Sequence, residues 1–386
     1  MWLSLVGMGL AAYLVVPHLG LMRGELVGGA ACSGGMFDCH AVTGSPWGRF
    51  LGVPLAFWGF FGYVLVFGLA LQALASPDSG ELLSALFALA LVFIVIDVVL
   101  ISIMAVAIRF FCGLCLASAA VNVGLLAATW PAAGGLAAIG RLGASLGALV
   151  PSRQRPAAGL FWGIVLVGAV GVSGVHVATT YLSRGTLGSL QPKIREFVAH
   201  QQRVQVDTSG DPRHGPATAA LELIEFSDFL CPICQRAAKL NKVILAGHRA
   251  ETALVFKHFP LDTTCNPAVS RMVHPGACEV AAASECAHQQ GQFWEFHDLV
   301  FAETPPYPVA RIDADAQAAG LEMTRFRACL ASGEGMEAVR RDVAAAGPLN
   351  VGSTPTYVFN GVIMPGILTP DTFESLAEEL RRPGRP

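Results

Sequence analysis

The sequence is poor in charged residues, and the shortage is greatest in its first half. Only 14% of its 386 residues are charged, and residues 1–183 carry six arginines, five acids and no lysine. Every lysine and most of the acids follow that point. A chain that is 53% hydrophobic and so unevenly charged differs from an ordinary soluble protein. We therefore expect one half to be built for lipid and the other for water.

The sequence also lacks an excess of basic residues. Its net charge is -3, with 25 lysines and arginines against 28 acids. Proteins that bind nucleic acids need a basic surface to attract the phosphate backbone. We therefore expect no nucleic-acid partner.

Five long apolar runs occupy the first half of the chain. They are Trp2–Met22, Phe50–Ser76, Leu82–Ile108, Phe110–Gly140 and Pro156–Ser183. Each reaches the roughly 20 residues that a helix needs to cross about 30 Å of hydrocarbon. The sequence therefore predicts a five-helix transmembrane bundle over residues 1–183, embedded in a lipid bilayer. Asp97 interrupts the third run, either as a carboxyl facing the bundle interior or as a proton carrier for a redox site.

The first apolar run has an alternative interpretation as a cleaved signal peptide, with Cys32 as a lipidated cysteine. No basic residue precedes the run and four further runs follow it. We therefore expect the chain to be retained whole. No transit peptide is visible, which favours a bacterial inner membrane over a chloroplast.

The character of the sequence changes after residue 183. The segment 184–216 reads as a linker that contains a short amphipathic helix over Gln191–Gln205 and then turn-forming residues. Residues 217–386 have the composition of a soluble domain.

The soluble domain opens with a pair of cysteines at the start of a helix. An alternating strand over Ala220–Phe226 precedes Cys231-Pro-Ile-Cys234 and an apolar-periodic stretch. Free N–H groups and the dipole at a helix start favour a thiolate, so Cys231 should have a lowered pKa and act as nucleophile, with Cys234 resolving the mixed disulfide. Half of a zinc site is the alternative, but no second pair of ligands has suitable spacing, so we expect no metal.

This region resembles the thioredoxin fold, and specifically thiol oxidases of the DsbA type, from residue 218 to about 380. The segment Val351–Gly361 reads as a loop, a strand and a hairpin turn, and the resemblance makes Pro355 the cis-proline that faces the cysteine pair. Gly291–Asp298 resembles part of the inserted helical subdomain of that family. The Pro-Ile dipeptide departs from the histidine that the strongest oxidants carry there.

The membrane half has two further cysteine pairs. Cys112-Gly-Leu-Cys115 lies in the first turn of the fourth helix, where residues three apart share a face about 5 Å apart and can form a disulfide. Cys32 and Cys39 lie in a glycine-bearing loop after the first helix. Three helices leave this loop and the 108–112 turn on the same side of the membrane, so the pairs can meet. The alternative is that Cys112 and Cys115 are small buried apolar residues.

With these pairs, residues 1 to about 130 resemble the vitamin K epoxide reductase family. The motif runs from Cys39 through Ser45-Pro-Trp-Gly-Arg49 to the Cys112–Cys115 pair. The resemblance implies a bound quinone, with Ser45 beside its pocket and Cys115 next to the ring. Ser45 also precedes a proline, so its other role is to cap a helix that begins there.

Four cysteines remain in the soluble domain, and we expect them to form structural disulfides. Residues 277–290 read as one helix, in which positions eight apart lie about 12 Å apart, so Cys278 cannot bridge Cys286. Of the two remaining connectivities, we prefer Cys265–Cys278 with Cys286–Cys329. We also expect the four histidines of this region to be capping or surface residues rather than ligands; they are His258, His274, His288 and His297.

These features predict a quinone-dependent membrane thiol oxidase that makes disulfides in exported proteins. Electrons would pass from substrate dithiols through Cys231–Cys234, Cys32–Cys39 and Cys112–Cys115 to a membrane quinone. A CxxC oxidant is useful outside the cytosol, so we expect the soluble domain on the periplasmic or extracytoplasmic side. Two alternatives are an outward electron relay that supports disulfide isomerisation or reduction, and a tethered, non-catalytic chaperone module.

Overall fold

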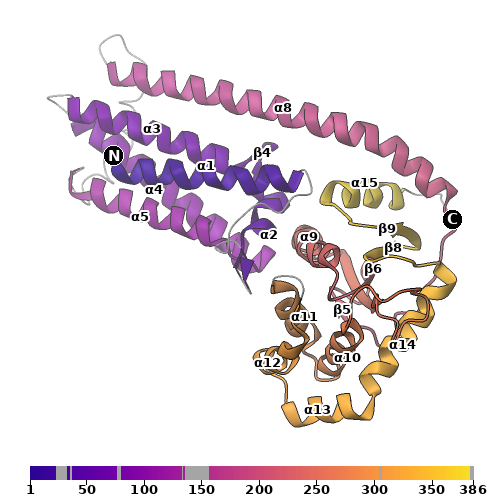
Figure 1. The fold of residues 1–386 in the computed structure, drawn as a ribbon. Helices are drawn as coiled ribbons and strands as arrows, with labels where there is room; N and C mark the ends of the chain where they lie inside the picture. Colours follow the sequence, from indigo (N-terminus) through magenta and orange to yellow (C-terminus); the bar gives the residue numbers. More distant parts are fainter. Residues whose placement is uncertain are drawn as a thin grey trace. The chain divides into compact units, whose positions relative to one another are not determined.

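The computed structural model describes residues 1–22, 33–34, 37–75, 80–132, 134, 156–303 and 307–382 (Figure 1). The chain divides into two compact units, Met1–Thr186 and Leu187–Pro386. The first unit is almost entirely helical, and the second combines a sheet with helices.

The first unit is built from long apolar helices. Its main helices are α1 (Trp2–Met22), α3 (Leu55–Ala75), α4 (Gly80–Ile103), α5 (Gly113–Ala132) and the start of α8 (Pro156–His200). Among the described residues, three stretches are long and apolar enough to cross a membrane: Leu55–Ala75, Leu82–Ile108 and Gly113–Pro131. The unit is therefore a helical membrane domain, while the count of five spans stays a prediction.

Close packing holds these helices together. Helix α1 packs against α3 and α5, and α4 packs against α5. Gly7 permits the approach of α1 to α3, because a Cβ at this position would lie 2.4 Å from a ring carbon of Tyr63. On the outside, Leu74 and Val106 are 75% and 77% exposed, as expected for side chains that meet lipid.

Helix α3 begins five residues later than the apolar run predicted. The strands β3 (Arg49–Phe50) and β4 (Val53–Pro54) pair in an antiparallel hairpin before the helix. Leu51 and Gly52 at its tip have φ of 52° and 76°, the left-handed pair that a tight hairpin turn requires. An apolar run therefore continued through a turn that hydropathy alone cannot detect.

The second unit contains a five-stranded sheet in the order β5-β7-β6-β8-β9. Its strands are β5 (Arg213–His214), β6 (Leu221–Ser227), β7 (Thr252–His258), β8 (Thr356–Phe359) and β9 (Val362–Pro365). Strands β6 and β7 are parallel, and the other neighbours are antiparallel. On the central strand, Ile224 lies opposite Val255 of β7 and Val358 of β8.

Seven helices follow β6, five of them inserted between β7 and β8. They are α9 (Pro232–His248), α10 (Ala277–His288), α11 (Phe293–Ala302), α12 (Ile312–Ala318), α13 (Met323–Ser332), α14 (Glu334–Ala346) and α15 (Pro370–Leu380). Helix α9 joins β6 to β7, and α15 follows β9 (Figure 1). The prediction of a thioredoxin fold with an inserted helical subdomain is therefore confirmed.

The central strand β6 is buried on both faces. Leu223 packs in one cluster with Phe373 of α15, and Ile224 packs in another with Ala346 at the end of α14. Neighbouring residues of a strand point to opposite faces, so helices must cover both sides of the sheet. Helix α9 begins five residues after the end of this strand.

The segment expected to be a linker, 184–216, belongs largely to the second unit. Helix α8 continues without a break to His200, so the separate helix predicted over Gln191–Gln205 is wrong in its bounds. Ile194 and Val198 on this helix are buried in the same cluster as Phe373. Further on, β5 adds an edge strand beside β7. Apolar residues of the segment 184–216 therefore pack against the core of the second unit.

Candidate active site

The cysteine pair of the second unit lies where β6 passes into α9. Cys231 is the N-cap residue of α9, Pro232 occupies its first turn, and Cys234 follows. Proline is favourable at a helix start because its fixed φ suits the helix and its missing N–H would have no partner there. Cys231 is 6% exposed, whereas Cys234 is fully buried. The first sulfur is thus the more accessible of the pair.

The segment before β8 contacts this pair. The Cys231 thiol donates a hydrogen bond to the Thr354 carbonyl oxygen at 3.7 Å, across 123 residues of sequence. The Thr354–Pro355 peptide bond is cis. The structure therefore brings Cys231, Cys234 and Pro355 together, in the arrangement that the thioredoxin resemblance implies.

The two sulfurs differ in acidity. A hydrogen bond from the Cys234 thiol, helped by backbone N–H groups of α9, lowers the pKa of Cys231 to about 6 despite its burial. Burial raises the pKa of Cys234, and the neighbouring charges of Cys231 and Glu225 raise it further. A thiolate is the nucleophile in disulfide exchange. The geometry therefore suits Cys231 as attacking sulfur and Cys234 as resolving sulfur.

Reduced Cys231 is expected to ionise with a midpoint at about pH 6. Replacing Cys234 with alanine should raise the midpoint, because it removes the thiol that donates to the Cys231 sulfur. Ultraviolet absorbance of the thiolate, recorded across a pH series, measures both values, and Cys231→Ser should lack the step. A wild-type midpoint in the ordinary range near 8.5 would contradict the expectation.

Glu225 on β6 is a candidate that the sequence analysis missed. It is fully buried, and its carboxylate accepts hydrogen bonds from Ser227 at 2.9 Å and Asn241 at 2.7 Å. Burial raises its pKa to about 7, so it can take a proton from Cys234 when that thiol resolves a mixed disulfide. The signal was available: Glu222 and Glu225 are three apart in a strand and point to opposite faces, so one must enter the core.

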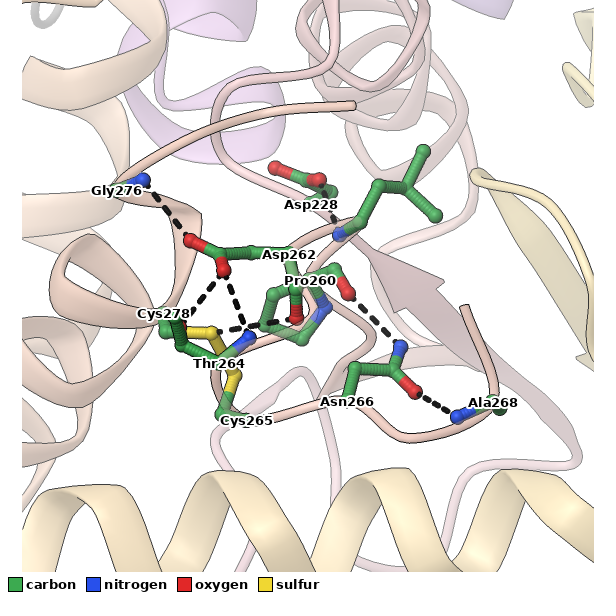
Figure 2. The surroundings of a disulfide bond; sticks show 10 residues. Asp228, Pro260, Asp262, Thr264, Cys265, Asn266, Ala268, Gly276 and Cys278 are labelled. Carbon is green, nitrogen blue, oxygen red and sulfur yellow. Dashed lines mark hydrogen bonds between the residues drawn. A yellow bond between two sulfur atoms is a disulfide. The ribbon is translucent and has the colours of Figure 1, made fainter. Parts of the chain in front are cut away.

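The loop after β7 is fastened by a disulfide and a carboxylate (Figure 2). Cys265 and Cys278 are disulfide-bonded, with their Cα atoms 6.0 Å apart. Asp262 accepts hydrogen bonds from the backbone N–H of Gly276 at 2.9 Å and of Thr264 at 3.0 Å. These bonds close the loop at both ends and fix its backbone.

This loop also places a histidine near Cys231. The Asp228 carboxylate accepts hydrogen bonds from the Leu261 N–H at 2.7 Å and from His274 Nδ1 at 2.8 Å. The hydrogen bond that His274 donates to Asp228 raises the pKa of His274, and the charge of Cys231 adds to the effect. A protonated His274 would in turn favour the Cys231 thiolate. The Pro-Ile dipeptide has no histidine, and the loop supplies one from another part of the chain.

The second pair, Cys286 and Cys329, is also disulfide-bonded and joins α10 to α13. Their Cα atoms lie 5.8 Å apart. The two disulfides, Cys265–Cys278 and Cys286–Cys329, are the pair that we preferred from the sequence.

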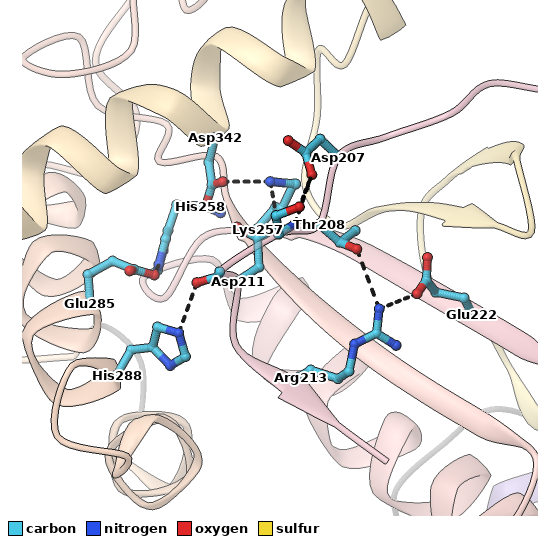
Figure 3. Close-up of polar contacts among 12 residues, drawn as sticks. Asp207, Thr208, Asp211, Arg213, Glu222, Lys257, His258, Glu285, His288 and Asp342 are labelled. Carbon is cyan, nitrogen blue, oxygen red and sulfur yellow. Dashed lines mark hydrogen bonds and ion pairs between the residues drawn. The ribbon is translucent and has the colours of Figure 1, made fainter. Parts of the chain in front are cut away.

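A buried polar cluster lies at the end of β7 (Figure 3). Lys257 Nζ lies 2.7 Å from an Asp211 oxygen and 2.9 Å from an Asp342 oxygen. His258 Nε2 lies 2.8 Å from a Glu285 oxygen. The group of His258, Glu285 and Asp342 has metal-ligand chemistry. Its carboxylates, however, already face the Lys257 ammonium and the His258 ring, so the cluster is explained by ion pairing.

The structure contradicts part of the expectation that the four histidines are capping or surface residues. His258 and His297 are 1% and 4% exposed, so placing them at the surface is wrong. The ring of each lies beside a carboxylate, Glu285 for the first and Asp298 for the second. Pairing with a carboxylate permits the burial of a histidine ring. The Glu285 partner of His258 comes from helix α10, so the sequence alone did not predict it.

In the membrane unit, Cys112 and Cys115 flank the start of α5. Cys112 is fully buried, and its sulfur accepts a hydrogen bond from the Cys115 backbone N–H at 3.2 Å. Arg109, just before them, has φ of 61° and ends the π-helical turn Met104–Ile108 that follows α4. This sharp stop turns the chain into α5 and places both sulfurs at the helix start.

Cys39 meets this pair. It is the first residue of the short helix α2 (Cys39–Gly44), whose N-cap Asp38 accepts hydrogen bonds from His40 and Ala41 N–H. The Asp38 N–H donates to the Phe111 carbonyl at 2.9 Å, and the Cys39 and Cys112 side chains are hydrogen-bonded. Cys39 is thus a buried helix residue rather than part of a flexible loop. Its partner in the predicted pair, Cys32, lies outside the described residues.

Ser45 is 1% exposed, but its side chain does not cap a helix. Its hydroxyl instead donates to the Val42 carbonyl at 2.8 Å, at the end of α2. The capping role proposed from the Ser-Pro dipeptide is therefore wrong: Pro46 begins only a three-residue 3₁₀ turn, and the α2 carbonyl competes for the hydroxyl.

A cavity of about 550 Å³ opens among α1, α3, α4 and α5. Cys115 lines it, together with mostly apolar side chains and the rings of Trp47 and Trp58. Polar side chains also line it: His18, Tyr63, Asp97, Ser118 and Asn122. Ser45 is not among the lining residues, although its neighbours Thr43 and Trp47 are.

Two family models match the chain, and together they cover most of it. Residues 1–130 match the vitamin K epoxide reductase family, and residues 222–378 match the DSBA-like thioredoxin domain. The chain joins a vitamin K epoxide reductase domain to a DSBA-like domain. The first of these domains contains Cys112 and Cys115, and the second contains Cys231 and Cys234.

Curated relatives match only part of this fusion. The chain is similar to the Na(+)/H(+) antiporter NhaA 3 of Salinispora tropica, with 35% identity over 158 residues, 41% of this chain and 23% of that protein. It is also similar to the antiporter NhaA of Herminiimonas arsenicoxydans, with 31% identity over 46% of this chain and 27% of that protein. The chain thus spans about a quarter of the length of the curated relatives it matches.

Solved structures are similar to about half of the chain. Oxidised BdbD from Bacillus subtilis has 20% identity and a TM-score of 0.40, covering 47% of this chain and 98% of that one. The catalytic domain of Proteus mirabilis ScsC has 17% identity and a TM-score of 0.38, covering 49% and 99%.

The cavity of the vitamin K epoxide reductase domain suits a quinone. Ligand pockets are typically about 300–1,000 Å³, mostly apolar, with a few polar groups that fix orientation. The cavity meets each condition and has Cys115 in its wall. His18 is a polar candidate that the sequence analysis missed: its Nδ1 is bonded to the Thr43 carbonyl at 3.0 Å, which orients the ring. A lone histidine in an apolar run was the signal that could have found it.

Proposed function

We propose that the protein is a thiol oxidase that forms disulfide bonds in exported proteins and passes the electrons through three cysteine pairs to a membrane quinone. The observation that carries the proposal is the contact between Cys39 and Cys112, next to the cavity that Cys115 lines. A cysteine outside the membrane CxxC that contacts this pair is what a disulfide relay into the bilayer needs.

Each exchange moves two electrons and conserves the number of disulfides. A substrate thiolate attacks Cys231 of the oxidised Cys231–Cys234 pair, and the second substrate thiol completes the substrate disulfide. The reduced Cys231 thiolate then attacks Cys32 of the Cys32–Cys39 disulfide, and Cys234 resolves the mixed bond.

The inner exchange follows the same chemistry. The Cys39 thiolate attacks Cys112 of the oxidised membrane pair, Cys115 leaves as a thiolate, and Cys32 resolves the Cys39–Cys112 bond. A quinone bound in the cavity would supply a two-electron, two-proton acceptor. The apolar lining excludes water from the Cys115 sulfur, and Trp47, Trp58 and His18 would hold the ring.

The proposal assigns the protein to a bacterial inner membrane, with the DSBA-like domain on the extracytoplasmic side. An oxidising CxxC and the two structural disulfides both suit an oxidising compartment. Reduced exported proteins and the quinone pool would be its partners.

Quinone reduction by the purified full-length protein tests the proposal. With a reduced dithiol peptide and either ubiquinone or menaquinone, we expect quinol and peptide disulfide in equal amounts. Cys231→Ser should abolish both products, because it removes the entry nucleophile. Absence of quinol with both quinones would refute a quinone-linked oxidase, and full activity of Cys231→Ser would refute entry through the DSBA-like domain.

A further inference from the structure

A hydrogen-bonded chain of polar side chains crosses the interior of the membrane domain. Tyr63 of α3 lies 2.8 Å from Ser118 Oγ and 2.8 Å from Asn122 Oδ1, both on α5. Asn122 Nδ2 in turn donates to Asp97 Oδ2 of α4 at 2.8 Å. The chain links three helices and ends at a carboxyl group.

The hydrogen bonds of this row of side chains have a direction. Asn122 Oδ1 can only accept, so the Tyr63 hydroxyl proton points to it, and the Ser118 hydroxyl donates to the Tyr63 oxygen. The Asn122 amide then donates to Asp97. Every donor therefore points toward the carboxylate, which makes Asp97 the terminal hydrogen-bond acceptor of the row.

The same chain begins beside the redox sulfur. Cys115, Ser118 and Asn122 are three and four residues apart on α5, so they lie on one face of that helix. Cys115 and all four members of the chain line the same cavity. The hydrogen-bonded side chains thus follow the cavity wall from the Cys115 sulfur to Asp97.

A carboxyl inside a membrane domain is costly, and a role in helix packing alone does not require one. An amide at position 97 could accept the same hydrogen bond from Asn122 without the cost of a charge. We propose that Asp97 is the proton-carrying residue of the Cys115 site, oriented by Asn122 and Tyr63. The inference rests on the proposed function for the identity of the electron acceptor.

The proton balance of the step is closed. Oxidation of the Cys112 and Cys115 thiols to a disulfide releases two electrons and two protons, and the acceptor takes up both. Asp97 receives one proton that leaves the thiol pair and gives it to the acceptor in the cavity, so it is unchanged after each turnover. The other proton passes without Asp97.

Asp97→Asn in the full-length protein tests this role, because it keeps size and hydrogen bonding but cannot carry a proton. We expect kcat for quinone reduction to fall about 10²-fold, as on loss of a general acid–base group, with KM for quinone unchanged. Asp97→Glu should restore part of kcat. Ser102→Ala is the matched control: Ser102 lies on the same helix, bonds to the Val98 carbonyl and does not line the cavity.

Two further measurements separate a proton-carrying role from a structural one. Quenching of Trp47 and Trp58 fluorescence by added ubiquinone should be the same in Asp97→Asn and wild type. Chemical reduction of the Cys112–Cys115 disulfide should shift the infrared carboxyl band in wild type and leave no such shift in Asp97→Asn.

The infrared shift is measured without quinone, so it tests the inference independently of the proposed function. A shift in a protein that reduces no quinone would support the role of Asp97 and refute the quinone. Wild-type kcat in Asp97→Asn, absence of the shift in wild type, or loss of quinone binding together with kcat would each overturn the inference.

Discussion

Replacing Cys115 with serine is expected to abolish quinone reduction and to trap a disulfide between Cys39 and Cys112. The two side chains are hydrogen-bonded in the structure, and Cys112 is buried beside Cys39. The Cys112 thiolate can attack the oxidised Cys32–Cys39 pair at Cys39, which releases the Cys32 thiolate. Without Cys115, the Cys39–Cys112 disulfide can be broken only by the reverse attack of Cys32. The trapped species should therefore accumulate as protein is oxidised.

Peptide mapping under non-reducing conditions identifies the trapped bond. Cys234→Ser is the matched variant for the outer exchange and should accumulate Cys32–Cys231 instead. A Cys32–Cys112 bridge in the first variant, or Cys39–Cys231 in the second, would reverse the proposed order of the relay while leaving its end points intact.

Loss of the Cys286–Cys329 bridge is expected to destabilise the DSBA-like domain by roughly 2–5 kcal/mol without disabling its active site. The bridge joins α10 to α13 and closes 43 residues, whereas Cys265–Cys278 closes 13. In the chain-entropy description, a bridge that closes a longer loop stabilises more. Cys286–Cys329 is therefore expected to contribute about 1 kcal/mol more than Cys265–Cys278 to the free energy of unfolding.

Chemical denaturation of the protein with Cys286→Ser and Cys329→Ser combined, compared with Cys265→Ser and Cys278→Ser combined, measures this difference. The alkylation rate of Cys231 should stay unchanged in the Cys286/Cys329 variant, because Cys231 is held by its own contacts at the start of α9 and with the Thr354 carbonyl. Equal unfolding free energies in wild type and both variants would show that neither bridge stabilises the domain.

Local patterns predicted much of this molecule because they depend on few residues. The apolar runs located the starts of α4 and α5 to within three residues, but α5 ends at Ala132, eight residues before the end of its run, and the Leu51–Gly52 turn interrupts the run of α3. Helix geometry excluded a Cys278–Cys286 bridge, since both residues lie on α10. The Cys231–Cys234 pair at a helix start followed from turn chemistry and dipole alone.

Features that depend on contacts across the fold were not predicted. Cys39 was expected in a glycine-bearing loop, but it begins the helix α2, whose cap Asp38 bonds to Phe111, a residue far away in sequence. The hydrogen bond that Asn241 donates to Glu225 also depends on the fold, because it joins β6 to α9. A bond between distant segments has no signature in a single run of residues.

The bond between Asp38 and Phe111 has a kinetic consequence. It fixes the backbone beside Cys39 and Cys112, so these sulfurs are presented to each other at high effective concentration without a search by diffusion. Exchange between them should therefore contribute little to the turnover time. The slow steps are expected to be those in which a partner must arrive by diffusion. These are the binding of a protein substrate at Cys231 and the binding of the quinone in the cavity.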